Sequence, residues 1–187
     1  LELAKNNFPD IIVSDNMMPE MNGVEMTKEL KSDPVTSHIP IIMLSVKSDK
    51  ENRLRGLEMG ADDYMEKPFD LDVLFAKVNN IIKQQEILKT KFSNELDFEL
   101  PEVSTNEKDK ELLEKIEKMI LEKIDEPSFL VQDLYTKLGF SKTFFFNKIK
   151  AMTGMGPKEL IRLIKLKEAA RLLASDQYNI SEVCYLV

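Results

Sequence analysis

The sequence predicts an α/β region followed by an all-α region. Two short apolar runs in the first half end in polar residues, at Asp15 and Ser45, and a third predicted strand ends at Lys67. Apolar runs of this length, rich in β-branched residues, are typical of strands buried on both faces of a parallel sheet. From residue 107 onward, apolar residues recur every three or four positions, which is the helical period. We therefore expect an α/β domain over 1–92, a linker over 93–106 and a helical domain over 107–187.

Asp15 is the first candidate functional residue. It directly follows the apolar strand that contains Ile11, Ile12 and Val13. In open parallel sheets, ligands and reacting groups gather beyond the carboxyl ends of the strands. An aspartate carboxylate can attack a phosphoryl donor and form an acyl phosphate. Asp15 is therefore placed for covalent chemistry.

Further residues extend the pattern around Asp15. They are Pro19, Gly23, Ser45 and the run Asp62-Asp63-Tyr64-Met65-Glu66-Lys67-Pro68-Phe69. Together with Asp15 they resemble the receiver domain of two-component response regulators, over roughly residues 1–93. The resemblance implies a flavodoxin-like α/β fold, phosphorylation of Asp15, and a histidine kinase as the phosphodonor.

The resemblance also implies roles for three residues around the phosphoryl group. Phosphoryl transfer is catalysed largely by positioning and by neutralising the charge on the phosphoryl oxygens. Ser45 matches the family's hydroxyl donor and Lys67 matches its lysine, so each would bind a phosphoryl oxygen. Tyr64 matches the aromatic residue that moves inward when the hydroxyl is drawn to the phosphate. The peptide bond between Lys67 and Pro68 is cis in this family.

Magnesium (Mg²⁺) is the cofactor that the resemblance implies. In the family the ion is held by the phosphorylated aspartate, by the carbonyl two residues later, and by acidic residues at the end of the first strand. Asp15 and the backbone carbonyl of Met17 match two of these ligands. Residues 1–5 match the end of the family's second helix, so we expect the first strand, first helix, second strand and remaining acidic ligands to be absent. A hard cation takes about six oxygen ligands, so this segment alone should phosphorylate poorly.

The expected absence of the first strand has a second consequence. It would leave the strand over 10–14 at an uncovered edge of the sheet. An exposed apolar edge strand is a template for pairing with another chain. We therefore expect self-association through the receiver region.

Composition bounds the remaining possibilities. The chain has 187 residues, a net charge of −7 and one cysteine, Cys184. One cysteine excludes an internal disulfide and is typical of a reducing compartment. No apolar run approaches the roughly 20 residues of a membrane span. We therefore expect a cytoplasmic location without membrane contact in this segment.

The charge is unevenly distributed along the chain. Residues 127–175 contain nine Lys and Arg against three Asp and Glu, whereas residues 93–126 contain five against twelve. A basic region beside an acidic connector is typical of a DNA-binding module joined to a regulatory domain. DNA is therefore an expected partner, although the net charge of the whole chain is negative.

The basic region contains a helix, a glycine turn and a second helix. We expect helices over 130–138 and 142–152, with a turn at Gly139, where glycine readily takes a positive φ. Pro157 then opens a long helix that reaches residue 175. This series resembles the AraC-type DNA-binding domain, in which one long helix joins two helix-turn-helix units. A second unit begins near Ile180, and we expect its recognition helix to be absent.

The predicted recognition helix, 142–152, has two faces at 100° per residue. The apolar face should pack on the preceding helix and consists of Phe145, Ile149 and Met152. The opposite face should enter the DNA groove and consists of Thr143, Asn147 and Lys150. Asn can bind adenine and the Thr methyl can contact thymine. Lys142 and Lys148 flank this face and are expected to contact phosphates.

These observations predict a phosphorylation-controlled, sequence-specific DNA-binding regulator of a two-component phosphorelay. The parent protein would be a response regulator or a hybrid histidine kinase, and the receiver's own phosphorylation and dephosphorylation would be the only enzymatic chemistry in this segment. An alternative is an interaction module that uses the receiver independently of phosphorylation. A third reading, mainly an autophosphatase, has only Asp15 to support it.

Overall fold

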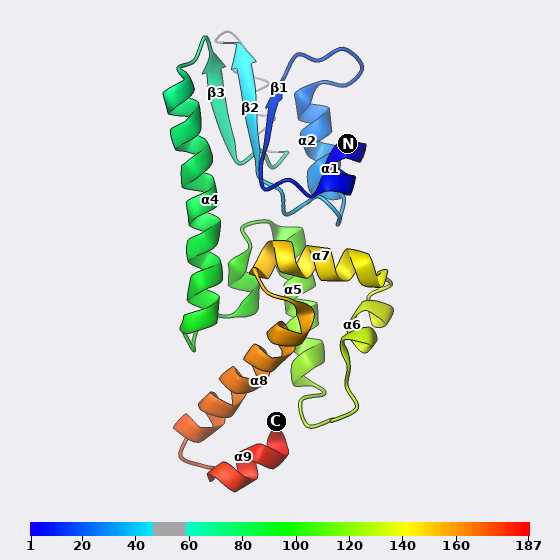
Figure 1. The fold of residues 1–187 in the computed structure, drawn as a ribbon, viewed down its shortest axis with the longest axis vertical. Helices are drawn as coiled ribbons and strands as arrows, with labels where there is room; N and C mark the ends of the chain where they lie inside the picture. Colours follow the sequence, from blue (N-terminus) through cyan, green and yellow to red (C-terminus); the bar gives the residue numbers. More distant parts are fainter. Residues whose placement is uncertain (47–58) are drawn as a thin grey trace. The chain divides into compact units, whose positions relative to one another are not determined.

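A computed structural model describes residues 1–46 and 59–187, which divide into two compact units, Leu1–Ile87 and Leu88–Val187. The first unit contains a β-sheet and helices (Figure 1). Its elements are α1 (Glu2–Asn7), β1 (Ile12–Asp15), α2 (Gly23–Ser32), β2 (Ile41–Val46), β3 (Asp63–Lys67) and α4 (Leu71–Asn94). Helix α4 begins in the first unit and ends in the second.

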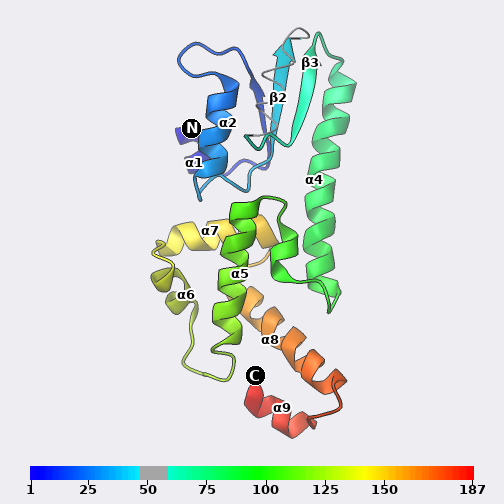
Figure 2. The same ribbon diagram turned by 180° about the vertical axis from the view of Figure 1, so that it is seen from behind.

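The three strands form a parallel sheet in the order β1-β2-β3. The central strand β2 contains Ile41, Ile42 and Met43, which are completely buried. Burial on both faces explains why this strand is a continuous apolar run. Helices α2 and α4 lie on opposite sides of the strands in both views (Figures 1 and 2). The first unit therefore has the parallel α/β arrangement that the sequence predicts.

Gly23 allows α2 to begin directly beside the end of β1. A Cβ atom at this position would lie 2.6 Å from the carbonyl oxygen of Asp15, which is closer than these atoms can pack. The N–H of Gly23 donates to the carbonyl of Asn16 at 2.9 Å. The side chain of Asn22 caps the helix by accepting the N–H of Glu25. The glycine of the receiver-like motif thus holds the loop after Asp15 against α2.

The second unit consists of helices and turns (Figure 1). Its elements after α4 are η1 (Leu100–Val103), α5 (Glu107–Leu121), α6 (Val131–Lys137), α7 (Lys142–Thr153), α8 (Pro157–Ala174) and α9 (Ile180–Leu186). One apolar core joins α5, α6, α7 and α8 and includes Leu113, Ile116, Ile120, Leu134, Phe145, Ile149 and Leu160. The helical period that begins near residue 107 therefore corresponds to a shared buried core.

The segment 93–106, which the sequence suggests is a linker, packs into this core. Leu100 is completely buried and Val103 is 5% exposed. Phe92, near the end of α4, is also completely buried in the same cluster. A 3₁₀ segment of four residues is too short to show a hydrophobic period, so pattern analysis assigns it to a linker. The packed helical unit therefore begins within α4 and not at residue 107.

Helices α6 and α7 are joined by a tight glycine turn. Gly139 has φ +73°, and the hydroxyl of Ser141 caps α7 by accepting the N–H of Phe144 at 3.3 Å. Gly154, with φ +78°, ends α7, and Pro157 opens α8. The helix bounds and both glycine positions confirm the expected helix, turn and helix.

Candidate functional sites

The register of the sheet places the receiver-like residues at one edge. Asp15 lies beside Leu44, so Ser45 is one residue further along β2. Lys67 lies beside Val46, the last residue of β2. Because the strands are parallel, Asp15, Ser45 and Lys67 all lie at their carboxyl ends, where open sheets bind ligands.

Lys67 and Asp15 form an ion pair at this edge. The Lys67 ammonium donates to Oδ2 of Asp15, and the N–H of Met17 donates to Oδ1 at 3.1 Å. The hydrogen bond from Lys67, followed by that from Met17, holds the pKa of the Asp15 carboxyl below its usual value. Asp15 is therefore an ionised, half-exposed carboxylate beside a fixed cation.

Ser45 and Tyr64 are more deeply placed than Asp15. Ser45 is 3% exposed and Tyr64 is 7% exposed. The Tyr64 ring packs in the core with Ile41 and Met43, so its side chain is directed inward. The peptide bond between Lys67 and Pro68 is cis, as the resemblance implies.

Oxygen ligands for magnesium are few among the residues that the structure describes. In residues 1–46 and 59–187, no group of three or more His, Cys, Asp or Glu side chains is arranged to hold a metal. Asp15 and the carbonyl of Met17 supply two types of oxygen ligand, whereas Mg²⁺ requires an octahedral set. The described residues therefore do not form a complete magnesium site.

The exposed face of α7 contains most of the residues expected to contact DNA. Its members are Lys142, Thr143, Asn147 and Lys150. The opposite face is buried, with Phe145 at 1%, Ile149 at 0% and Met152 at 5% exposure. This division agrees with the two faces expected from the sequence.

Lys148 is not on the exposed face of α7. Its side chain is 1% exposed, and its ammonium donates to Oδ1 of Asp109 in α5 at 2.7 Å. A lysine with a buried ammonium cannot contact a phosphate without breaking this pair. The expected phosphate contact of Lys148 is therefore wrong, because its ammonium forms an internal ion pair.

Other basic residues of the C-terminal region also bind internal partners. Lys165 donates to the carbonyls of Ile124 and Val187, at 2.5 Å and 2.9 Å. Lys167 donates to two carbonyls in the segment just after α4, those of Glu95 at 2.6 Å and Phe98 at 2.7 Å. Its burial lowers the pKa of the Lys167 ammonium. Part of the positive charge counted in the sequence therefore stabilises the fold, whereas Lys142, Lys150, Lys158 and Arg162 are exposed.

Asp109 is a residue that sequence analysis missed. It lies four residues before Leu113 and seven before Ile116, so it continues the apolar stripe of α5. A charged residue at such a spacing faces the core. An acidic residue on the apolar stripe of one helix and a lysine beside the apolar face of another would have indicated a buried ion pair.

No helix in residues 1–46 and 59–187 is both long enough and apolar enough to cross a membrane.

Comparisons with known proteins identify the first unit. Residues 1–79 match the response regulator receiver domain model. "Histidine kinase P4" from Formosa agariphila is 40% identical over 187 residues, which is 100% of this chain and 14% of that protein. The phosphate regulon transcriptional regulatory protein PhoB from Pseudomonas aeruginosa is 43% identical over 76 residues, which is 41% of this chain and 33% of that protein.

Among solved structures, the receiver domain of a signal transduction histidine kinase from Syntrophus aciditrophicus is 41% identical. The match covers 41% of this chain and 58% of that chain, with a TM-score of 0.38.

The chain therefore contains a response regulator receiver domain of a two-component system, with the flavodoxin-like parallel α/β fold. It spans 14% of the length of the histidine kinase and 33% of the length of PhoB. The similarity to the histidine kinase extends over the whole chain and so includes the helical unit.

Proposed function

We propose that this chain is the phosphorylation-controlled, DNA-binding output of a two-component phosphorelay. One observation carries the proposal: a receiver domain is followed, after α4, by a helical unit in which α6, a turn at Gly139 and α7 come in the order that a helix-turn-helix requires. The exposed face of α7 is polar and basic, as recognition helices are. The arrangement is that expected of an AraC-type domain.

Asp15 is the proposed phosphoacceptor. Its carboxylate oxygen would form a bond to phosphorus while the bond from phosphorus to the donor's leaving group breaks, giving an acyl phosphate. Lys67, which already donates to Asp15, would then pair with a phosphoryl oxygen. Ser45 would donate its hydroxyl to another oxygen, and the buried Tyr64 ring would fill the space behind it. In a complete receiver, which would supply the remaining acidic ligands, Asp15 and the Met17 carbonyl would be two of the ligands of a magnesium ion that neutralises phosphoryl charge.

The phosphodonor in this proposal is a histidine kinase. Support comes from the histidine kinase of Formosa agariphila, whose sequence contains a region similar to this whole chain. The parent protein would then be a hybrid kinase that carries its own receiver and DNA-binding unit. Apart from phosphorylation and dephosphorylation of Asp15, we assign no catalytic reaction to this segment.

The proposed DNA contacts divide by their chemistry. Asn147 is placed to bind adenine with its amide, and Thr143 to contact a thymine methyl. Lys142 and Lys150 would contact phosphates, which add affinity and salt dependence but no sequence information. Lys148 is excluded from this set because its ammonium is bound to Asp109.

The experiment that tests DNA recognition starts from a pool of randomised duplexes. The chain selects bound duplexes through several rounds, and anisotropy titrations then compare the selected site with single-base variants. We expect a preferred site, with Asn147→Ala losing about 1–3 kcal/mol of discrimination at one base pair. Asn80→Ala, at an exposed position on α4, is the matched control.

The same selection can also reject the proposal. If selection returns no preferred sequence and every duplex binds alike, sequence-specific regulation is rejected. Retained binding to a protein partner under those conditions would favour an interaction module instead.

A further inference from the structure

Asp109 and Lys148 form an ion pair in the interior of the helical unit. Lys148 Nζ donates to Oδ1 of Asp109 at 2.7 Å, and the two side chains are 2% exposed or less. Asp109 lies in the first turn of α5, and Lys148 lies in the middle of α7. The pair therefore joins the proposed recognition helix to a helix outside the helix-turn-helix.

Stability alone gives a weak reason for such a pair. Removing two charges from water costs about as much as their attraction returns, and well-packed apolar residues often replace a buried ion pair without loss. A charge-assisted hydrogen bond does, however, require a particular distance and angle. The ion pair between Asp109 and Lys148 therefore fixes the orientation of the two side chains more than it stabilises the fold.

The buried apolar residues of α7 do not fix its orientation in the same way. Phe145, Ile149 and Met152 lie in the apolar core, and the hydrophobic effect is non-directional. Apolar cores that keep their volume lose a unique arrangement before they lose stability. A helix held by these three residues alone could turn about its axis at small cost, and its exposed residues would turn with it.

We propose that Asp109 is a positioning residue for DNA recognition, which acts through Lys148 to set the rotation of α7 about its own axis. The proposal rests on the DNA-binding function proposed above. Asn147 directly precedes Lys148, so a rotation that moves one moves the other. Bidentate binding of a base depends on alignment, whereas a lysine binds phosphate as a point charge. Loss of the pair should therefore reduce base discrimination more than overall affinity.

The test removes both charges together in the full chain. Removal of one side chain would leave the other buried charge without its ion-pair partner, which is strongly destabilising. The double variant Asp109→Leu with Lys148→Met keeps the site apolar, and a thermal melt shows whether it folds. The matched control is Lys123→Met with Glu126→Gln, which removes a half-exposed ion pair of 2.6 Å.

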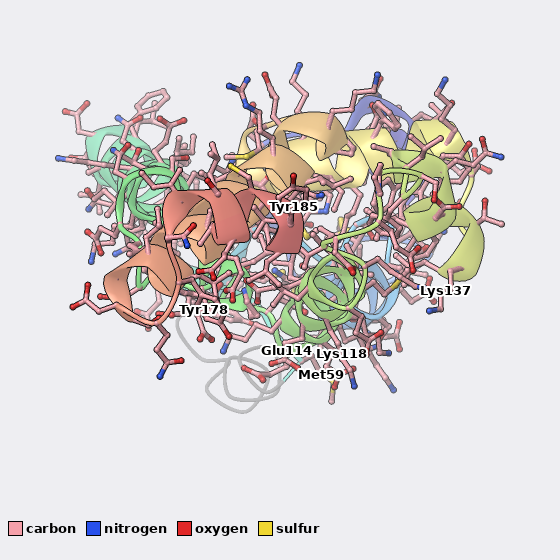
Figure 3. The ribbon with its side chains drawn as sticks, turned by 90° about the horizontal axis from the view of Figure 1, so that it is seen from below. Met59, Glu114, Lys118, Lys137, Tyr178 and Tyr185 are labelled. Carbon is pink, nitrogen blue, oxygen red and sulfur yellow. The ribbon has the colours of Figure 1, made fainter. Side chains whose placement is uncertain are left out.

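Double electron–electron resonance measures the distance between two spin labels, and this distance reports the rotation of α7. The labels are attached at Glu114→Cys on α5 and Asn147→Cys on α7, after the exposed Cys184 has been replaced by Ser. Figure 3 shows Glu114 at the outer surface of α5. We expect one narrow distance distribution with the ion pair present and a broader or shifted one in the double variant. An unchanged distribution in the folded double variant overturns the proposal.

A second variant covers the case in which the double variant does not fold. Asp109→Glu keeps the charge but lengthens the side chain by one methylene. A narrow distribution centred at a different distance would support positioning by the pair. The wild-type distance in this variant would contradict it.

DNA discrimination is measured on unlabelled protein with the selected site and its single-base variants. In the double variant the affinity ratio at the base pair read by Asn147 should fall about tenfold, while affinity for an unrelated duplex stays near the wild-type value. An unchanged ratio overturns the recognition role. If wild-type protein shows no base preference, the DNA-binding function fails, and the distance distributions still decide whether the pair orients α7.

Discussion

Lys67 binds Asp15 across an intervening strand. Asp15 ends β1 and Lys67 ends β3, with β2 between them in the sheet. The lysine side chain reaches the carboxylate because both strands end at the same edge. A cation therefore lies beside the carboxylate that we propose as the phosphoacceptor.

Replacement of Asp15 should abolish phosphorylation. In the full-length gene product, Asp15→Asn should give no acyl phosphate with a small-molecule phosphodonor and magnesium, because an amide cannot act as the acceptor. Intact-protein mass spectrometry measures the product. Asp10→Asn, at an exposed position before β1, should phosphorylate normally. Phosphorylation of Asp15→Asn at the wild-type level would exclude Asp15 as the acceptor.

The Asp15 carboxyl should titrate at a lower pH than an ordinary aspartate. Its pKa is lowered in the folded state by Lys67 and Met17, so the folded state binds fewer protons than the unfolded state. Its contribution to stability is therefore present above the ordinary aspartate pKa of about 3.9 and is lost as pH falls through the lowered value. Carbon-13 NMR should show this low pKa, and Lys67→Ala should raise it. Equal values in both proteins would mean that the ion pair is absent in solution.

Exposed lysines of α7 should determine the salt dependence of DNA binding. Lys142→Ala and Lys150→Ala should each weaken binding to all duplexes alike and reduce the slope of log affinity against log salt by about 1. Lys115→Ala, at an exposed position on α5, should leave the slope unchanged. Titrations at several salt concentrations measure these slopes. An unaltered slope in both α7 variants would remove this face from the DNA interface.

Glu117→Gln should stabilise the helical unit at neutral pH. Burial raises the pKa of the Glu117 carboxyl, although the N–H of Leu100 donates to it at 3.4 Å. The folded state therefore binds more protons than the unfolded state, and stability is lost as pH rises from the ordinary value of about 4.3 through the raised pKa. The neutral amide avoids this loss, so its advantage in melting temperature should be present at pH 7 and disappear in acid.

The control for Glu117→Gln is Glu114→Gln. Glu114 is exposed on the same helix, so its replacement should change the melting temperature little at any pH. An identical increase in both variants would point to the net charge of α5 and not to burial of Glu117.

Local patterns in the sequence predict much of the receiver and of the helix-turn-helix. The strands near Asp15 and Ser45 follow from short apolar runs, whereas the position of Lys67 follows from its place in the receiver-like motif. Gly139 and Gly154 mark turns because both take positive φ values. These features depend on a few neighbouring residues, which a sequence displays directly.

Long-range partners explain what the sequence could not predict. Lys148 flanks the polar face of α7 in the sequence as Lys142 does, and only the approach of Asp109 from α5 shows that Lys148 is buried. In the same way, Lys167 has acceptors about 70 residues away. Net charge counts such lysines as surface charge, whereas the fold uses them as internal donors.

The position of Phe92, Leu100 and Val103 in the helical core determines where the protein can be divided. A fragment that starts at residue 107, where the helical period begins, would lack all three side chains and the carbonyls that bind Lys167. Burial of each apolar side chain contributes about 1.5–3 kcal/mol, and whole domains are stable by only about 5–15 kcal/mol. Proteolysis between α4 and α5 should therefore unfold the helical unit instead of releasing it, whereas a fragment that starts at Leu88 retains every one of these groups.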